Sequence, residues 1–304
     1  MSTYLRAVVT TRCPMACAYC HMEGDPAVRG AEGGLPTDTL VALLRAGVQS
    51  GVRKLKLLGG EPLLRADLPA VIRAVARPDL DISVITSGTA PVANLRACVE
   101  AGLSRANMSI HGWGEAAFAR RGGGAATRRR RDETLAVLLA WGRPLKLNYV
   151  YGGPGDREDL AGLLEWAAGE RVVVGVLDDL GREDLGPAAI VDVLRALRGP
   201  EARSRVEPDP HSLPTLRLHW DDGLEVEVKD QHLGEHAPWT ACRACPKRAR
   251  CGEGIDAVRL THTGMLRPCM DRTDLGVPLL PVLAAGGEPA VVATWRRYVG
   301  EVRA

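Results

Sequence analysis

The sequence is short of aromatic side chains, of lysine and of long apolar runs. Only 4% of its 304 residues are aromatic, with one phenylalanine, and lysine supplies just five of the 39 basic residues. No apolar run approaches the length of a membrane-spanning helix, and residues 1–10 lack the apolar core of a signal peptide. These absences predict a cytoplasmic protein. The net charge of +2 gives no reason to expect nucleic-acid or membrane binding.

Cysteine is present in two clusters. Seven of the eight cysteines fall within residues 13–20 and 242–269, and Cys98 stands alone in a helical pattern, as expected for a small core residue. In a cytoplasmic protein, clusters of this kind indicate metal or redox chemistry rather than disulfides.

Short β-branched runs alternate with helical patterns as far as residue 199. The predicted strands are 4–11, 54–60, 81–87, 104–110, 145–151 and 171–177, and the helical patterns lie near 36–50, 66–76, 91–101, 133–141, 157–168 and 187–198. Six strand–helix units in a row predict a parallel α/β structure, either an open doubly wound sheet or a partial barrel.

The pattern changes after residue 200. A hairpin over 215–229, a cysteine-rich stretch, a second hairpin around Thr263–Gly264 and a helix near 290–302 predict a small α+β domain. We therefore expect two domains, 1–200 and 201–304.

The first cysteine cluster has the spacing C-x3-C-x2-C, at Cys13, Cys17 and Cys20. Structural zinc sites usually pair two C-x2-C units, so this spacing fits zinc poorly. Three close thiolates suit an iron–sulfur cube that keeps one iron open for a ligand. After the second predicted strand comes "GGEP", Gly59–Pro62, where two glycines permit close approach to a ligand or simply form a tight turn.

These two motifs together resemble the radical S-adenosylmethionine (SAM) superfamily, whose signature is C-x3-C-x-aromatic-C, with Tyr19 here as the aromatic residue. The resemblance covers the first 200 residues and implies a partial (β/α)6 barrel. It also implies a [4Fe–4S] cluster on the three cysteines, whose open iron binds SAM for reductive cleavage to a 5′-deoxyadenosyl radical. The SAM contacts that it implies are Tyr19, Gly59, Gly60, Glu61, Thr86, Ser87, Ser109 and Asn148.

Polar residues recur on one face of several predicted strands. Arg6, Lys54, Lys56 and Lys146 lie in strands, and alternation places Asn107, Ser109 and His111 on one face. A single strand lysine is more often at a sheet edge, but three in register with Arg6 predict a basic cavity for an anionic or richly polar substrate. His111 either caps its loop or contacts substrate. The segment 120–131, RRGGGAATRRRR, is most simply a mobile, solvated insertion, and the alternative is a lid.

The second cluster reads C-x2-C-x5-C-x17-C, at Cys242, Cys245, Cys251 and Cys269. The residues alone allow structural zinc or a second [4Fe–4S] cluster. The stretch "VRLTHTGMLRPC" resembles the C-terminal segment of the GTP 3′,8-cyclases, and the spacing also resembles twitch and SPASM domains, so we expect an auxiliary [4Fe–4S] cluster.

Resemblance to the cyclases implies that Arg6, Lys54, Lys56, Lys146 and Arg259 bind substrate, and His111 is a further candidate. Three differences argue against GTP cyclisation itself: the extra Cys251, Ala257 in place of a second arginine, and Ser109–Ile110–His111 in place of "SLD". The C-terminal Gly-Gly of the cyclases is also replaced, by Val302–Arg303–Ala304.

The sequence therefore predicts a radical SAM enzyme with two [4Fe–4S] clusters that acts on a nucleotide, nucleoside or sugar derivative. A flavodoxin- or ferredoxin-type reductant is expected from the resemblance, and nothing indicates the oligomeric state. Two alternatives are a SPASM-type maturase that modifies a ribosomally made peptide, and an iron–sulfur or zinc scaffold without enzymatic activity.

Overall fold

The computed structural model describes residues 4–21, 23, 33–179, 182, 184–208, 212–234, 239–246, 248, 251 and 256–303. Every residue predicted above to hold a cofactor or substrate lies within this part of the chain. Within it, no helix is long and apolar enough to cross a lipid bilayer.

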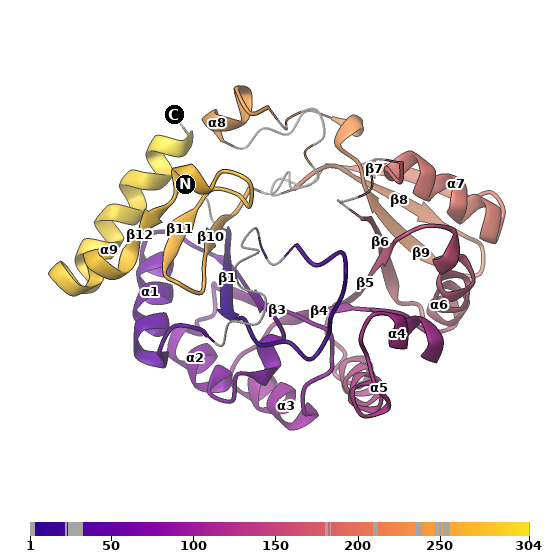
Figure 1. Cartoon of the computed structure of the whole chain (residues 1–304), viewed down its shortest axis with the longest axis horizontal. Coiled ribbons are helices and arrows are strands. Elements are labelled where there is room, and N and C mark those ends of the chain that lie inside the picture. The colour runs from indigo at the N-terminus through magenta and orange to yellow at the C-terminus, as the bar shows by residue number, and fades with distance from the viewer. Residues whose placement is uncertain are drawn as a thin grey trace.

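Six parallel strands form the centre of the fold, as the sequence predicts. They are β1 (Tyr4–Thr10), β2 (Lys54–Gly59), β3 (Asp81–Thr86), β4 (Arg105–Ser109), β5 (Leu145–Tyr151) and β6 (Val173–Asp178), paired in chain order. The sheet curves, and the helices lie around its outer side (Figure 1). They are α1 (Thr37–Gln49), α2 (Leu68–Val75), α3 (Val92–Glu100), α4 (Glu115–Arg120), α5 (Ala125–Ala140), α6 (Arg157–Glu170) and α7 (Pro187–Arg198).

Alternation along the strands separates the core from the hollow side of the sheet. On β1, Leu5, Ala7 and Val9 are fully buried against the helices, whereas Arg6, Val8 and Thr10 face inward. β2, β4 and β5 alternate in the same way, with apolar residues outward and lysine, asparagine or serine inward, whereas β6 presents Val173 and Leu177 to the hollow side. The predicted inward polar face is therefore present.

The chain after residue 200 extends this sheet at both edges. β7 (Arg203–Glu207), β8 (Thr215–His219) and β9 (Glu225–Lys229) continue from β6, while β10 (Val258–Leu260), β11 (Met265–Arg267) and β12 (Val277–Pro278) continue from β1. The described residues thus form one open sheet of 12 strands, not a closed barrel. Both predicted hairpins are confirmed, as β8–β9 and β10–β11. The domain boundary at 201 stays a prediction, because the later strands share the sheet of the earlier ones.

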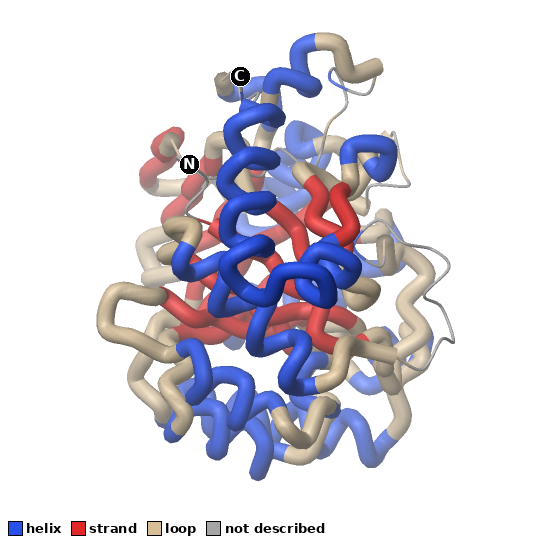
Figure 2. Tube along the Cα trace, turned by 90° about the vertical axis from the view of Figure 1, so that its left-hand side faces the viewer, coloured by secondary structure: helices blue, strands red, loops and turns tan. Residues whose placement is uncertain are grey.

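Two further helices follow β9, a short α8 (Thr240–Arg243) and the long α9 (Leu279–Arg303), which contains a non-helical residue at Gly287. Figure 2 shows α9 running across the face turned to the viewer. It packs on α1, where the Trp295 ring lies so close to Gly47 that a Cβ there would come within 3.0 Å. Arg296 also donates to the Gln49 carbonyl, at 2.9 Å. Short 3-10 turns cover Pro62–Leu64, Pro154–Asp156, Gln231–Leu233 and Thr273–Leu275.

Candidate active site

A cavity of about 1020 Å³ lies on the hollow side of the sheet, at the size expected for a small-molecule site. Its walls come from β1–β6, from β7–β10 and from the loop after β1. Of the residues predicted to bind a cofactor or substrate, those that line it are Arg6, Cys13, Cys17, Tyr19, Cys20, Lys54, Lys56, Gly59, Gly60, Thr86, Ser87, Ser109, His111, Lys146, Asn148 and Arg259. Their individual roles stay predictions, but the fold brings them together.

The first three cysteines share the loop that leaves β1. Their thiols are free of disulfides, and the Cys20 N–H donates to the Cys17 carbonyl at 3.2 Å. Burial, together with the negative charges of Glu61, Cys17 and Cys20, raises the pKa of the Cys13 thiol to about 11. Three thiolates this close together would repel one another unless they ligated a shared cationic group. This donor set fits an iron–sulfur cube held by Cys13, Cys17 and Cys20.

Gly59 and Gly60 allow the cysteine loop to lie directly against the end of β2. The Gly60 N–H donates to the Thr10 carbonyl at 2.8 Å, and the Glu61 N–H donates to the Arg12 carbonyl at 2.7 Å. A Cβ at Gly59 would lie 2.1 Å from the Thr10 oxygen, and one at Gly60 would lie 2.2 Å from the Arg12 oxygen. The two glycines therefore permit a close approach of the chain's own cysteine loop. Their contact with SAM stays a prediction.

Glu61 is the one predicted SAM contact that does not line the cavity. Its carboxylate is fully buried and accepts hydrogen bonds from the Thr86 hydroxyl at 2.7 Å and from the Ser87 N–H at 2.7 Å. The Ser87 hydroxyl and the Leu63 N–H donate to it as well. Burial raises the pKa of Glu61, although these hydrogen bonds oppose the shift. Glu61 therefore positions the end of β3, and Thr86 and Ser87 face the cavity.

Tyr19 and His111 connect the cysteine loop to the end of β4. The Tyr19 hydroxyl lies 2.6 Å from His111 Nδ1. Burial and the nearby Arg121 guanidinium lower the pKa of His111 to about 4, so its ring is neutral at pH 7. The Arg121 guanidinium lies 5.1 Å from the centre of the Tyr19 ring and donates to Asp156 at 2.6 Å. His111 therefore holds the Tyr19 side chain in place. A contact between His111 and substrate stays a prediction.

Cationic side chains run in register across the inner face of the sheet. Arg259 on β10 is level with Arg6 on β1, and Arg6 is level with Lys56 on β2. Lys146 on β5 completes the set predicted from the sequence. The structure adds Arg105, Arg217 and Lys229 to the cavity wall. Arg105 shares the alternating face of Asn107 and could have been found from the sequence, whereas Arg217 and Lys229 reach the cavity only because β8 and β9 join the sheet.

Acidic residues offset part of this charge. Glu23, beyond Cys20 in the same loop, pairs through one oxygen with Arg6 at 3.0 Å and through the other with Arg259. Burial alone would raise the pKa of Glu23, but Arg6 and Arg259 outweigh burial and hold it well below its usual range. On the opposite wall, Glu227 pairs with Lys146 and with Arg217. Glu23 was missed because nothing in its local pattern marks it.

The second set of cysteines lies outside the cavity wall, in the region of α8 and β11. Burial raises the pKa of the Cys242 thiol, and the neighbouring thiols of Cys251 and Cys245 raise it further. The Arg272 N–H donates to Cys269 Sγ at 3.3 Å, and the negative charges of Cys245 and Cys269 contribute, after Asp274, to a raised pKa of Arg272. The four thiols therefore share one neighbourhood. Within the described residues, no group of three or more His, Cys, Asp or Glu side chains is arranged around a single metal ion.

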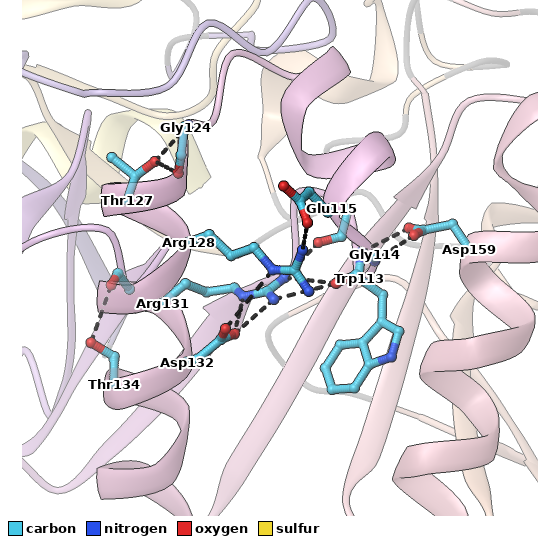
Figure 3. A network of polar contacts seen from close by, with 12 residues as sticks. Trp113, Gly114, Glu115, Gly124, Thr127, Arg128, Arg131, Asp132, Thr134 and Asp159 are labelled. Atoms are coloured by element: carbon cyan, nitrogen blue, oxygen red, sulfur yellow. Dashed lines mark hydrogen bonds and ion pairs between the residues drawn. The ribbon is translucent and has the colours of Figure 1, made fainter.

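The arginine-rich segment 120–131 is only in part the solvated insertion that its composition suggests, because Arg120, Arg129 and Arg130 are exposed but its last arginine is not. Its second half begins α5, and Arg131 is only 2% exposed. Figure 3 shows the Arg131 guanidinium directed at the turn after β4, where it donates to the carbonyls of Gly112 at 2.6 Å and Trp113 at 3.2 Å. The same turn is fixed from α6, because Asp159 accepts from the Trp113 and Gly114 N–H groups. No residue of 120–131 lines the cavity, so the structure gives no support to a lid.

Comparisons with known proteins agree with this geometry. The family model described as the radical SAM superfamily matches residues 7–167. A GTP 3′,8-cyclase of Mycobacterium marinum is 32% identical, over 97% of this chain and 82% of the relative. A probable GTP 3′,8-cyclase of Halobacterium salinarum is also 32% identical, over 89% and 79%. The crystal structure of SuiB from Streptococcus suis superposes with a TM-score of 0.60 at 13% identity, covering 87% of this chain and 59% of SuiB, and shows the similarity of fold alone.

Proposed function

This chain is an enzyme of the radical SAM superfamily, and we propose that its substrate is a small, multiply anionic molecule of the nucleotide class. The observation that carries the proposal is the line of cations across β10, β1 and β2, opposite Lys146 and Arg217. Arginine and lysine are the side chains that bind phosphate groups most strongly. A cavity with this lining favours a phosphorylated substrate over an uncharged sugar or an apolar peptide segment.

Cys13, Cys17 and Cys20 would hold a [4Fe–4S] cluster, and Tyr19, Gly59, Gly60, Thr86, Ser87, Ser109 and Asn148 would surround SAM. When bound, cluster and SAM supply one electron and a 5′-deoxyadenosyl radical that abstracts hydrogen. We extend the proposal to a second [4Fe–4S] cluster on Cys242, Cys245, Cys251 and Cys269, and to a flavodoxin- or ferredoxin-type reductant.

The protein's own residues bind and orient the substrate. Arg6, Lys56 and Arg259 would contact its anionic groups, because they form a continuous register across three adjacent strands. Lys146 and Asn148 line the cavity on β5 and pack against Gly175 of β6. A Cβ at Gly175 would come within 2.5 Å of the Lys146 side chain. The substrate's reactive carbon would then be held between the cation line and the cysteine loop.

GTP is the first compound to test, since the similar cyclases are named for it. We nevertheless expect a product that differs from that of the GTP 3′,8-cyclases. Ala257, which is buried beside β10, stands where resemblance to the cyclases implies a second arginine, and Cys251 adds a thiol beside Cys242. Both differences fall in the C-terminal part of the chain, beside the strands that complete the sheet.

The test is formation of 5′-deoxyadenosine by protein purified and reconstituted without oxygen, with dithionite as reductant. We expect GTP or another nucleotide to raise the rate at least tenfold above the rate without substrate, and the corresponding nucleosides to have no effect. Arg259→Met should raise the nucleotide concentration needed for half-maximal stimulation about tenfold, because one charge-assisted hydrogen bond to the nucleotide is lost. Cys17→Ala should abolish 5′-deoxyadenosine altogether. Stimulation by nucleosides and nucleotides alike would contradict the proposal, as would stimulation only by peptides.

A further inference from the structure

Lys56 stands at the β2 end of the line of cations that runs from Arg259 on β10 through Arg6 on β1. It lies on β2, level with Arg6 on β1 and with Ser83 on β3, and its side chain points into the cavity. The residue is only 8% exposed. Its ammonium group lies 5.9 Å from the centre of the Tyr4 ring, which Lys54 also approaches, at 4.8 Å.

Four cationic side chains surround Lys56. Arg6 faces it from β1, Lys54 from its own strand, Arg105 from β4 and Lys146 from β5. The nearby carboxylates are engaged elsewhere: Glu23 pairs with Arg6 and Arg259, Asp81 with Arg105, and Glu227 with Lys146 and Arg217. Among the described residues, no carboxylate forms an ion pair with Lys56.

A buried ammonium without a counter-ion, among four other cations, is costly to keep charged. Burial lowers the pKa of Lys56 well below its usual value, and Arg6, Arg105, Lys54 and Lys146 lower it further. An anion bound against Lys56 would supply the missing counter-charge and raise the pKa of Lys56 again.

We propose that Lys56 is a neutral amine in the empty cavity and takes up a proton from solvent when an anionic group of the substrate binds beside it. This inference rests on the proposed function, since it assumes an anionic ligand. The Lys56 nitrogen gains a proton and a positive charge, and no electron moves. Binding of the anion and protonation of Lys56 therefore stabilise each other.

The coupling fixes the sign of the pH dependence. At a pH above the empty-cavity pKa of Lys56, binding has to draw a proton from solvent, so affinity falls as pH rises, by up to about tenfold per pH unit. At a pH below that value Lys56 is already charged, and the proton uptake disappears. A lysine that stayed charged throughout would produce neither effect.

The experiment is calorimetric titration of the reconstituted enzyme, in the presence of SAM, with inorganic triphosphate in buffers of different ionisation enthalpy. We expect the wild type to take up close to one proton more than Lys56→Arg on binding triphosphate. The guanidinium of Lys56→Arg stays charged, so this variant measures the protons that the triphosphate alone takes up. Lys54→Met is the matched control: it removes a cation from the same strand and the same tyrosine ring but should keep the extra proton. Equal uptake by wild type and Lys56→Arg would overturn the inference and leave the proposed function standing. No binding of triphosphate, GTP or other nucleotides by the wild type would overturn both.

A second measurement applies even if Lys56→Arg does not bind. The chain has only five lysines, so selective ¹³C labelling at the ε-carbon gives a spectrum of at most five signals. We expect one signal, absent from Lys56→Met, to titrate below the usual lysine range in the empty protein and to move to the charged position on addition of triphosphate. A Lys56 signal that remains at the charged position throughout would overturn the inference.

Discussion

At the scale of single residues, the buried charges of this protein depend on very few partners. Glu23 is the clearest example, because its one carboxylate pairs with Arg6 and with Arg259 on neighbouring strands. Removing it would leave two buried guanidinium groups facing each other beside Lys56. The loss of a partner from a buried ion pair typically costs about 3 kcal/mol.

Glu23→Gln is therefore expected to lower the free energy of unfolding by about 3 kcal/mol at pH 7. The two arginines hold the pKa of Glu23 below its usual range, so its contribution is complete above the unfolded-state pKa of about 4 and is lost as pH falls through the lower, folded-state value. Urea denaturation from pH 7 to pH 3 measures this, and the difference from wild type should shrink on acidification. Glu115→Gln, at an exposed pair with Arg128, is the control and should change stability by less than about 0.5 kcal/mol. A difference that stays constant with pH would contradict the assignment.

At the scale of elements, the six parallel strands and most helices could be predicted because alternation and apolar periodicity mark them directly. Of the residues that the sequence predicted to hold the first cluster, SAM or substrate, all but Glu61 line the cavity. It could not identify Glu23 or Arg217, which reach the site through a loop and an added sheet edge, nor the structural role of Glu61. In the segment 120–131 a run of arginines predicts exposure, which is correct for Arg129 and Arg130 but wrong for Arg131. That side chain is buried where it donates to backbone carbonyls, which no sequence pattern marks.

The contact between the end of β2 and the cysteine loop gives a test at this scale. Gly60→Ala would place a Cβ 2.2 Å from the Arg12 carbonyl and force the loop outward. We expect the iron content after reconstitution to fall by at least half, with a loss of stability of about 1–3 kcal/mol. Gly124→Ala, where nothing lies within 4 Å of the added methyl, should retain full iron content. Full iron content in Gly60→Ala would show that the loop does not need this contact.

The turn after β4 gives a second test. Arg131→Met removes the hydrogen bonds to Gly112 and Trp113 that join α5 to this turn, and should cost about 2–3 kcal/mol of stability. The exposed Arg130→Met is the matched control and should stay within about 0.5 kcal/mol of wild type. Thermal unfolding measures both, and equal melting temperatures for the two variants would be inconsistent with a structural role for Arg131.

At the scale of the whole molecule, the last hundred residues complete the sheet that the first two hundred begin. β9 covers the edge of β6, β10 covers the edge of β1, and α9 packs on α1. A fragment of residues 1–200 would expose both edges and the apolar face of α1. We expect it to aggregate or to lack cooperative unfolding, as measured by gel filtration and circular dichroism. A monomeric fragment that unfolds cooperatively would instead support the predicted boundary at residue 201.

The pairing of β1 with β10 also has a consequence for how the protein acquires its structure. Leu5 on β1 lies opposite Val258 on β10, and all of the strands β2–β9 lie between these two strands along the chain. β10 is therefore synthesised long after β1. Contacts so distant along the chain carry a large loop-closure entropy and slow the folding rate. The edge of β1, next to the loop with Cys13, Cys17 and Cys20, therefore stays open until β10 has been synthesised. We expect those thiols to remain accessible in the nascent chain until β10 pairs with β1.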